Sequence, residues 1–498
     1  MIAHLRPSKR WFAIPLGIVA LLGTLAWIHS APLPFPTPAQ QELIVLTQPG
    51  ALTYDDSDPE NIGGLEHDLT ELFARELGVG IRYVLASPEE LPSLLRANNV
   101  HLAAAWLTPL NGIAKTVSPS FLDSHDVLAQ HEASLPITVP AMLAGRTVHV
   151  IAGSRQAATA EQLKAKLADL KVVELSKTSA FELLEQVASR RIEYAIVDSA
   201  DFGVALQVAP SVQASLEFGQ PHPIVWAFPD NTNPELIARA EEFLRRIQSD
   251  PVFARLKDRY FGHIHRLDND DIARFIELSR SQLPKLRPLF QTAQAATGID
   301  WRLLAALAYQ ESQWDPLATS PTGVRGIMML TEDTADHLGI KNRLDPGESI
   351  LAGARYLEQL RQQIPMATPE PERTWLALAA YNIGPGHFRA ALTIGRQMNA
   401  DVTAWHEMKR VLPLLAKPQY YQRLKSGRAR GGEAVTLVEN VRSYYDILSR
   451  YETPYQRLVG AKPLTLASTG LNPGSGIGLR KTAPSLSVPA KAANIPEL

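Results

Sequence analysis

The sequence predicts two folded domains of different classes, an α/β domain followed by an all-α domain. The chain has 498 residues, which is too long for one ordinary domain. Between residues 42 and 266, short β-rich runs alternate with helical ones, as in α/β proteins. From about residue 271 to residue 451, apolar residues recur with a helical period and alternating runs are nearly absent. The chain is therefore expected to be multidomain.

The elements of the first domain follow from its apolar runs, which are short where a strand is expected and periodic where a helix is expected. The predicted strands are ELIVLT (42–47), IRYVLA (81–86), HLAAAWL (101–107), RTVHVIAG (146–153), KVVELS (171–176) and EYAIVDS (193–199). The predicted helices are HDLTELFARELG (67–78), LPSLLRANN (91–99), AEQLKAKLADL (160–170) and AFELLEQVASRR (180–191). This alternation predicts largely parallel sheets.

The second domain consists of long amphipathic segments. The main ones are IARFIELSRSQLPKLRPLFQTAQAAT (272–297), WRLLAALAYQES (301–312), for which Asp300 is the expected N-cap, and WLALAAYN (375–382). HIHRLDND (263–270) has metal-ligating residue types but lies at the domain join, so a solvated linker is expected there and no metal site. We expect domains at 42–268 and 269–455. The Pro-, Gly- and Ser-rich tail at 456–498 is predicted to be disordered.

The N-terminus resembles an export signal. Arg6, Lys9 and Arg10 precede an uncharged apolar run at 11–28, and a Pro-rich linker follows at 31–41. The apolar run is long enough to span a bilayer, so residues 1–30 are either a cleaved signal peptide or a retained anchor. The chain has no cysteine, which excludes disulfides, thiolate nucleophiles and a lipid-modified cysteine. A net charge of −2 gives no reason to expect nucleic acid as a partner.

Glu311 is the candidate for acid catalysis. It shares one helical face with Leu304, Leu307 and Ala308. Burial on that face disfavours the charged carboxylate and raises the pKa, which makes a carboxyl group a proton donor near neutrality. The alternative is an inert glutamate paired with a nearby cation, for which Arg325 is available.

Two loops accompany this glutamate. SPTGVRGIMML (320–330) offers Ser320, two glycines and the pair Met328 and Met329, which suits a groove for an extended polar ligand. AAYNIGPGH (379–387) carries Tyr381 and Asn382 before Gly384, Pro385 and Gly386. The glycines and proline alone indicate a helix stop, whereas the Tyr-Asn pair is able to present a phenol and an amide to a sugar.

The run ESQWDPLATSPTGVRGIMMLT (311–331) resembles the catalytic signature of lysozyme-like soluble lytic transglycosylases. AYNIGPG (380–386) and VENVRSYYDIL (438–448) resemble the second and third segments of that family. The resemblance implies an all-α lysozyme-like domain in which Glu311 is the catalytic acid and base. It implies that Ser320 and Tyr381 position the muramoyl residue and that Asn382, Met328 and Met329 line the groove. Met329 stands where glutamine is common in the family, and Leu437 stands where many relatives have tyrosine.

The first domain resembles the family-3 periplasmic solute-binding fold, which has two lobes with the ligand between them. The similar stretches are HLAAAWLTPLNGIAKTVSPSFLDSHDVLA, LAGRTVHVIAGSRQAATAEQL and YAIVDS. Asn111 stands where the usual ligands are held by an arginine, Asp198 is the counterpart of the acidic ligand-binding residue, and Ser154 is available to an anion. Because the arginine is absent, capture of a free amino acid is not expected. A cell-wall fragment, such as a stem peptide, is the expected regulatory ligand.

The two domains in this order resemble the membrane-bound lytic murein transglycosylase F family, over residues 42–451. This implies a lyase without metal or cofactor that cleaves the MurNAc–GlcNAc β-1,4 bond of peptidoglycan and forms a 1,6-anhydromuramoyl end. Asp315, Glu332 and Asp333 are the other carboxylates near Glu311, and none is expected to act. The periplasm is the implied location, with peripheral association with the outer membrane. The alternative function is a non-catalytic murein-binding or sensor protein.

Overall fold

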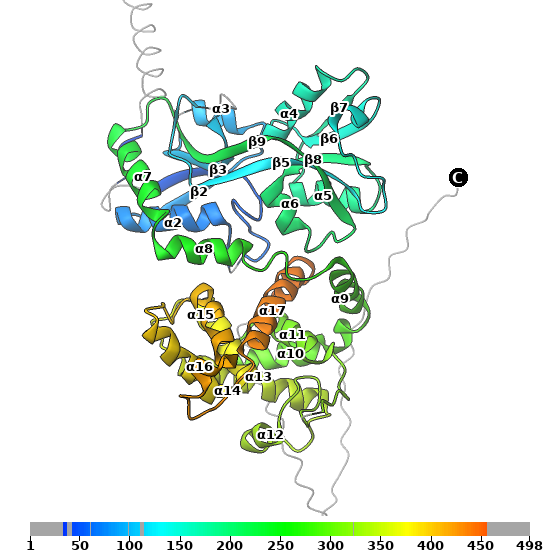
Figure 1. Cartoon of the computed structure of the whole chain (residues 1–498). Coiled ribbons are helices and arrows are strands. Elements are labelled where there is room, and N and C mark those ends of the chain that lie inside the picture. The colour runs from blue at the N-terminus through cyan, green and yellow to red at the C-terminus, as the bar shows by residue number, and fades with distance from the viewer. Residues whose placement is uncertain are drawn as a thin grey trace, which may run out of the picture. The chain divides into compact units, whose positions relative to one another are not determined.

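A computed structural model of the chain describes residues 33–36, 42–59, 61–97, 99–109, 114–321 and 323–455 (Figure 1). The predicted export signal, most of the Pro-rich linker and the predicted disordered tail lie outside the described residues. Asn111 also lies outside them. No helix within the described ranges is both long enough and apolar enough to cross a bilayer.

All strands of the described chain fall between residues 43 and 228 and join into one sheet (Figure 1). They are β1 (Leu43–Thr47), β2 (Ile81–Leu85), β3 (Leu102–Leu107), β4 (Thr116–Val117), β5 (Leu122–His131), β6 (Thr147–Ile151), β7 (Lys171–Leu175), β8 (Tyr194–Asp198) and β9 (Val212–Phe228). The order is β2-β1-β3-β9-β5-β8-β6-β7, and β4 pairs with β9. Every predicted strand is present, and the structure adds β4, β5 and β9.

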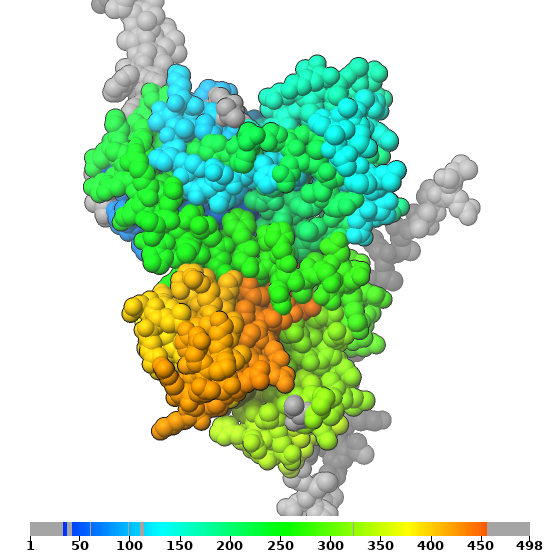
Figure 2. Space-filling view, in the orientation of Figure 1, coloured from blue at the N-terminus to red at the C-terminus, as the bar shows by residue number. Residues whose placement is uncertain are grey.

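The sheet is parallel only toward its two ends. β1 runs parallel to β2 and β3 in the first lobe, and β6 runs parallel to β7 and β8 in the second lobe. The long strands β5 and β9 pair antiparallel with each other, with β9 also antiparallel to β3 and β5 to β8. The prediction of largely parallel sheets therefore holds for each lobe but not for the two strands that connect them. In the space-filling view the surface is indented between the lobes (Figure 2).

Helices cover this sheet on both faces. They are α2 (Leu65–Leu77), α3 (Leu91–Arg96), the 3-10 helix η2 (Pro140–Leu143), α4 (Arg155–Lys164), α5 (Ala180–Ala188), α6 (Ser199–Ala205), α7 (Pro234–Ile247) and α8 (Pro251–Phe261). Helix α2 ends where predicted, at Gly78, which has the left-handed φ of 70° that ends many helices. Helix α4 starts five residues before the predicted 160–170 segment, because Ser154 caps it by accepting a hydrogen bond from the Ala157 N–H.

From residue 269 the described chain is helical (Figure 1). The helices are α9 (Asn269–Ser281), α10 (Leu283–Thr297), α11 (Trp301–Ser312), α12 (Glu332–Leu338), α13 (Pro346–Gln363), α14 (Glu372–Gln397), α15 (Trp405–Val411), the 3-10 helix η3 (Leu412–Ala416), α16 (Pro418–Tyr421) and α17 (Gly431–Tyr451). One large apolar core unites them, with α11 at its centre. The predicted stop at Gly384 is a break inside α14: this glycine has a φ of 80° and helical geometry resumes after it.

Most of the segment 263–270 is exposed, as its composition predicts, but its first two residues, His263 and Ile264, are buried. His263 is only 4% exposed, and its Nε2 lies 2.6 Å from an Asp446 carboxylate oxygen on α17. Its backbone carbonyl accepts a hydrogen bond from the Ser443 hydroxyl at 3.1 Å. Contacts with α17, which are distant in sequence, therefore bury this residue, and local composition could not indicate them.

Candidate active site

Glu311 lies in the last turn of α11, at the edge of the helical core. The helix starts where predicted, because the Asp300 carboxylate accepts a hydrogen bond from the Arg302 N–H at 2.8 Å. Every residue from Trp301 to Tyr309 is buried, so the core surrounds the helix and does not line one face of it. Gln313 ends the helix with a left-handed φ of 53°. The glutamate is half-buried at the point where α11 leaves the core.

The electrostatic setting of Glu311 is that of a neutral acid. Burial raises its pKa from 4.5 to about 8, and no other cause contributes. Among the described residues Glu311 makes no ion pair, and Arg325, the partner in the alternative interpretation, is exposed. Without a cation to hold the carboxylate, the carboxyl group carries its proton at neutral pH.

This setting predicts a pH-dependent cost in stability. The pKa of Glu311 is raised in the folded chain, so the folded chain holds a proton that the unfolded chain releases between pH 4.5 and about 8. The free energy of unfolding therefore falls as the pH rises through this window. We expect Glu311→Gln to exceed wild type by about 1–3 kcal/mol at pH 8, and the gap to close near pH 4.5. Thermal unfolding at both pH values measures this, and an equal gap at both would contradict it.

The loop after α11 is held by its own backbone. Arg325 and Leu330 exchange two backbone hydrogen bonds of 3.1 and 3.0 Å, and the Gly326 N–H donates to the Ala318 carbonyl at 2.9 Å. Gly326 has a φ of 82°, and a Cβ on it would lie 1.8 Å from the Arg343 carbonyl oxygen. Ser320 is half-buried, and its hydroxyl accepts a hydrogen bond from the Val324 N–H at 3.3 Å. The loop is therefore a tight hairpin pressed against the backbone of a neighbouring segment.

Tyr381 brings the second loop to the first. Its hydroxyl donates to the Met328 carbonyl at 2.9 Å. Burial, and then the nearby Glu311 carboxylate, raise the pKa of Tyr381 well above its ordinary value. The ring of Tyr356 packs against it with centroids 5.4 Å apart. Tyr381 thus joins Glu311 and the 320–330 loop at one place.

The remaining predicted groove residues differ in exposure. The Met328 side chain is fully buried, and Gly353 on α13 leaves the space it fills, since a Cβ there would lie 2.6 Å from the Met328 Cε. Met328 therefore offers its carbonyl, not its side chain. Met329 is half-buried with a left-handed φ of 46°, and Asn382 is exposed.

No second buried carboxyl group accompanies Glu311 within the described loops around it. Asp315 is exposed and caps a turn by accepting the Leu317 N–H at 2.9 Å. The Glu332 side chain is 80% exposed, and Asp333 is exposed at the start of α12. Two-carboxylate glycosidases need a nucleophile or base opposite the acid, and this site offers a single acid.

Sequence reasoning missed a chain of hydrogen bonds at helix α11, which carries Glu311. The Asn440 amide on α17 donates to the side-chain carbonyl of Gln310, the neighbour of Glu311, at 3.0 Å. Asn440 in turn accepts from the Arg266 Nε at 3.2 Å. Asn440 belongs to the VENVRSYYDIL segment, so its place in that motif was the available signal.

The α/β half holds a cavity of about 580 Å³ between its lobes. Its lining includes Ser87 from the first lobe, Lys177 and Phe181 from the second lobe, Asp201, and Arg450 from α17. Arg450 pairs with an Asp55 carboxylate oxygen at 2.9 Å and lies 5.1 Å from the Phe181 ring centre. The lining therefore combines apolar side chains with a few charged groups, and a side chain of the helical half reaches it.

Of the predicted ligand residues of this half, Ser154 and Asp198 do not line that cavity, and Asn111 lies outside the described residues. Ser154 is the cap of α4, and Asp198 is 3% exposed with its carboxylate on the Ser124 hydroxyl. Asp201, three residues further on, faces the cavity instead. Burial and then the Asp198 charge raise the pKa of Asp201 to about 7, and Arg450 opposes them. A strand-end aspartate was the expected ligand residue, but one helical turn separates it from the cavity-lining one.

Comparisons with known proteins agree with this arrangement. The Transglycosylase SLT domain family matches residues 288–402, and the bacterial extracellular solute-binding proteins, family 3, match residues 43–263. A membrane-bound lytic murein transglycosylase F from Nitrosospira multiformis is 38% identical over 454 residues, which are 91% of this chain and 94% of the relative. A protein of the same name from Methylobacillus flagellatus is 39% identical, with 88% and 94% covered. A solved structure of an ancestral arginine-binding protein bound to arginine covers 45% of this chain and 99% of its own, at 20% identity and a TM-score of 0.41.

The curated relatives match both halves of the chain in the same order and nearly end to end. The fold is an α/β domain of the solute-binding-protein class followed by a helical SLT domain. The chain belongs to the membrane-bound lytic murein transglycosylase F family and is a lytic transglycosylase that acts on peptidoglycan.

Proposed function

We propose that Glu311 carries the whole proton cycle of cleavage at the MurNAc–GlcNAc β-1,4 bond. The observation that supports this most directly is a buried carboxyl group without an ion pair and without a second buried carboxylate among its described neighbours. A pKa of about 8 keeps that group protonated at neutral pH, as a general acid requires.

The proposed reaction consumes no water, because every proton and bond is accounted for by Glu311 and the glycan. Glu311 donates its proton to the glycosidic oxygen, the bond from that oxygen to C1 of MurNAc breaks, and GlcNAc leaves as an alcohol. The 2-acetamido group of MurNAc stabilises the cation at C1. The Glu311 carboxylate then takes the proton of the MurNAc 6-hydroxyl, whose oxygen bonds to C1 and closes a 1,6-anhydro ring. Glu311 ends the cycle protonated, ready for another turn.

The two loops have the proposed task of holding the glycan. Ser320, in the 320–330 loop, and Tyr381, whose hydroxyl donates to the Met328 carbonyl, position the muramoyl residue. Asn382 and Met329, which retain exposed surface, shape the groove. Met328 contributes the carbonyl that fixes the Tyr381 hydroxyl.

Tyr381→Phe is expected to lower kcat/KM by about 3- to 30-fold, because it removes one hydrogen bond worth about 0.5–2 kcal/mol. Ser320→Ala should fall in the same range for the same reason. Tyr356→Phe, which keeps the ring beside Tyr381, is the control. Rates on purified sacculi measure these effects, and a loss in either variant as complete as that of Glu311→Gln would give that residue a role in the proton cycle.

Product analysis tests the proposed reaction. Sacculi digested by the full chain should release muropeptides with 1,6-anhydromuramoyl ends, which mass spectrometry distinguishes from reducing ends by the mass of one water. Reducing ends would contradict the lyase chemistry. Binding of sacculi with no product from the wild-type chain would favour the non-catalytic sensor instead.

We also propose that the α/β half binds a cell-wall peptide fragment and thereby regulates the helical half. The support is the 580 Å³ cavity between its lobes, with Asp201, Lys177 and Arg450 available to a peptide's amino and carboxylate groups. A ligand that binds there competes with Asp55 for Arg450. Coupling of roughly 1–3 kcal/mol would change the rate several-fold.

Calorimetry on the full-length Glu311→Gln chain, with stem peptides and with free amino acids, tests this ligand class. Stem peptides should bind, and Asp201→Asn should weaken binding while the exposed Asp333→Asn leaves it unchanged. Tight binding of free amino acids together with no binding of stem peptides would refute the proposal.

The proposed place of action is the periplasm, with peripheral association with the outer membrane. The support is the export-type N-terminal sequence and the extracytoplasmic location of peptidoglycan. Fractionation of cells that carry the full chain tests this, and recovery in the cytoplasm would contradict it.

A further inference from the structure

Three buried ionisable side chains meet where β5 and β9 connect the two lobes, away from Glu311 and from the lining of the interlobe cavity. They are Asp126 on β5, Asp198 at the end of β8 and His222 on β9, and their exposed fractions are 0%, 3% and 2%. Asp126 pairs with Asp198 across β5 and β8, and Ser124 pairs with His222 across β5 and β9. Strand pairing therefore fixes all three positions.

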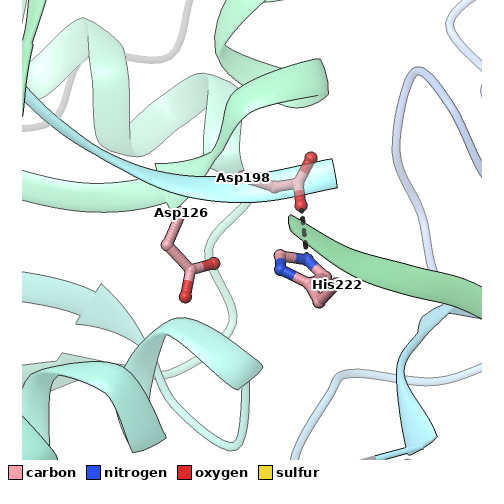
Figure 3. A group of neighbouring side chains, drawn as sticks. All are labelled: Asp126, Asp198 and His222. Carbon is pink, nitrogen blue, oxygen red and sulfur yellow. Dashed lines mark ion pairs between the residues drawn. The ribbon is translucent and has the colours of Figure 1, made fainter. Parts of the chain in front are cut away.

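The ligand-type atoms of these three residues all lie within 4.8 Å of one another. Figure 3 shows the two nitrogens of the His222 ring on the side of the two carboxylates. A buried polar atom without a partner costs about 1–3 kcal/mol, so the partners of each atom decide what this cluster accommodates.

Only one of the two carboxylate oxygens of Asp198 accepts hydrogen bonds. Its Oδ1 accepts from the Ser124 hydroxyl at 2.6 Å and from the Ala200 N–H at 2.9 Å. Its Oδ2 makes no hydrogen bond with any described residue. The carboxylate is therefore held in one orientation by one oxygen, and the other oxygen points at His222.

The ring nitrogens of His222 have no hydrogen-bond partner among the described residues. Nε2 nevertheless lies 3.4 Å from the Asp198 Oδ2. Two ligand atoms bound at 2.0–2.1 Å to a tetrahedral ion are about 3.4 Å apart. The separation of Nε2 and Oδ2 therefore matches one edge of a metal coordination shell, in a pair that does not have hydrogen-bond geometry.

Asp126 is the third residue of the cluster, and neighbouring side chains orient its carboxylate. It accepts from the Gln156 amide at 2.8 Å and from the Thr159 hydroxyl at 2.6 Å, and the Arg155 Nε lies 3.5 Å away. Such outer hydrogen bonds are usual around metal-binding carboxylates.

We propose that Asp126, Asp198 and His222 bind one divalent transition-metal cation, of the class of Zn²⁺, at the point where the connecting strands of the lobes cross. One imidazole nitrogen with two carboxylate oxygens favours this class over Mg²⁺, which prefers oxygen ligands alone. The ion joins β5, β8 and β9 and is a structural ion of the α/β half. It takes no part in the cleavage chemistry at Glu311.

The rival occupant is a proton, which would make His222 an imidazolium paired with Asp198. An imidazolium has two N–H donors, and neither finds an acceptor in hydrogen-bond geometry among the described residues. A metal ion satisfies Nε2 and the free Asp198 oxygen together. The experiment separates the two occupants because only the metal requires an added cation.

The test uses the full chain after dialysis against a chelator. Calorimetry with ZnCl₂ should give one bound ion per chain, and a hundredfold excess over the dissociation constant should raise the Tm of the α/β half by about 5 °C. The same titration with MgCl₂ should give neither effect. A wild-type chain that binds no Zn²⁺, with no shift in Tm, overturns the proposal.

Matched histidine variants assign the ion to this site. His222→Gln should lose the bound ion and the Tm shift, whereas His337→Gln, at an exposed histidine of α12, should keep both. Zn²⁺ bound equally by both variants overturns the assignment. If His222→Gln does not fold, the absorption of Co²⁺ in the wild-type chain decides: an intense visible spectrum of a four-coordinate nitrogen-oxygen site supports the proposal, and the weak spectrum of hydrated Co²⁺ overturns it.

Discussion

Glu311→Gln is expected to lower turnover of peptidoglycan by about 10³-fold or more while the chain remains folded. Glutamine keeps the shape of the side chain but cannot give a proton to the glycosidic oxygen or take one from the 6-hydroxyl. The half-buried position accepts a neutral amide readily, because the wild-type carboxyl group is itself neutral there at pH 7. Release of soluble muropeptides from sacculi measures the rate, and circular dichroism confirms folding.

Asp315→Asn is the matched control, since Asp315 is the nearest exposed carboxylate along the chain and caps only a turn. It should retain most of the activity. The wild-type rate should also fall as the pH rises above about 8, where Glu311 loses its proton. Substantial activity in Glu311→Gln, or a loss of similar size in Asp315→Asn, would reassign the acid.

Gly326→Ala is expected to have the second largest effect and to destabilise the helical half by several kcal/mol. The alanine Cβ would lie 1.8 Å from the Arg343 carbonyl oxygen. This oxygen belongs to the backbone, so a change of side-chain rotamer cannot relieve the clash. The φ of 82° adds the strain of a left-handed conformation, about 1–2 kcal/mol. The hairpin must move away from Arg343, and Met328 and Ser320 move with it, so activity should also fall strongly.

Gly323→Ala separates the clash from the strain. Gly323 has nearly the same φ, 84°, but a Cβ there would meet nothing within 4 Å. Its cost should therefore be the strain alone, about 1–2 kcal/mol. Thermal unfolding and sacculus digestion of both variants give the comparison. Equal destabilisation by the two substitutions would show that the contact with Arg343 does not matter.

Local signals in the sequence were sufficient to predict the helix that carries Glu311. Helix α11 has the predicted bounds because its cap, Asp300, and its apolar residues lie within the same thirteen-residue stretch. Gly78 ends α2 for an equally local reason. The position of Glu311 among apolar neighbours likewise followed from helical spacing, although the core turned out to surround the helix.

The strands that connect the lobes could not be predicted in the same way. β9 contains Gly219, Pro221 and Pro223, which normally interrupt strands, and its pairing with β5 is irregular in that region. What keeps it extended is a partner strand about ninety residues earlier in the chain. Pairing over such a distance leaves no periodic trace in either segment alone.

The site residues show the same limit. The sequence predicts a Met328 side chain in the groove, but that side chain fills the space left by Gly353 on another helix. Asp201 and Asn440 acquire their positions from the fold, Asp201 at the cavity wall and Asn440 against Gln310 on α11. Motif spacing identifies the residues that a reaction requires, while tertiary packing determines which neighbours orient them.

Helix α17 contacts both places where ligands are proposed to bind. Asn440 holds Gln310 beside the proposed acid Glu311, and Arg450, about 15 Å further along the same helix, reaches the cavity of the α/β half. If a peptide in that cavity shifts α17 and thereby raises the affinity of the chain for glycan, bound glycan must raise the affinity for the peptide by the same factor. This follows because coupled binding free energies are reciprocal. A chain already bound to a glycan strand would then bind cell-wall peptides at lower concentrations than a chain without glycan. The enzyme would respond most strongly where intact wall and its breakdown products occur together.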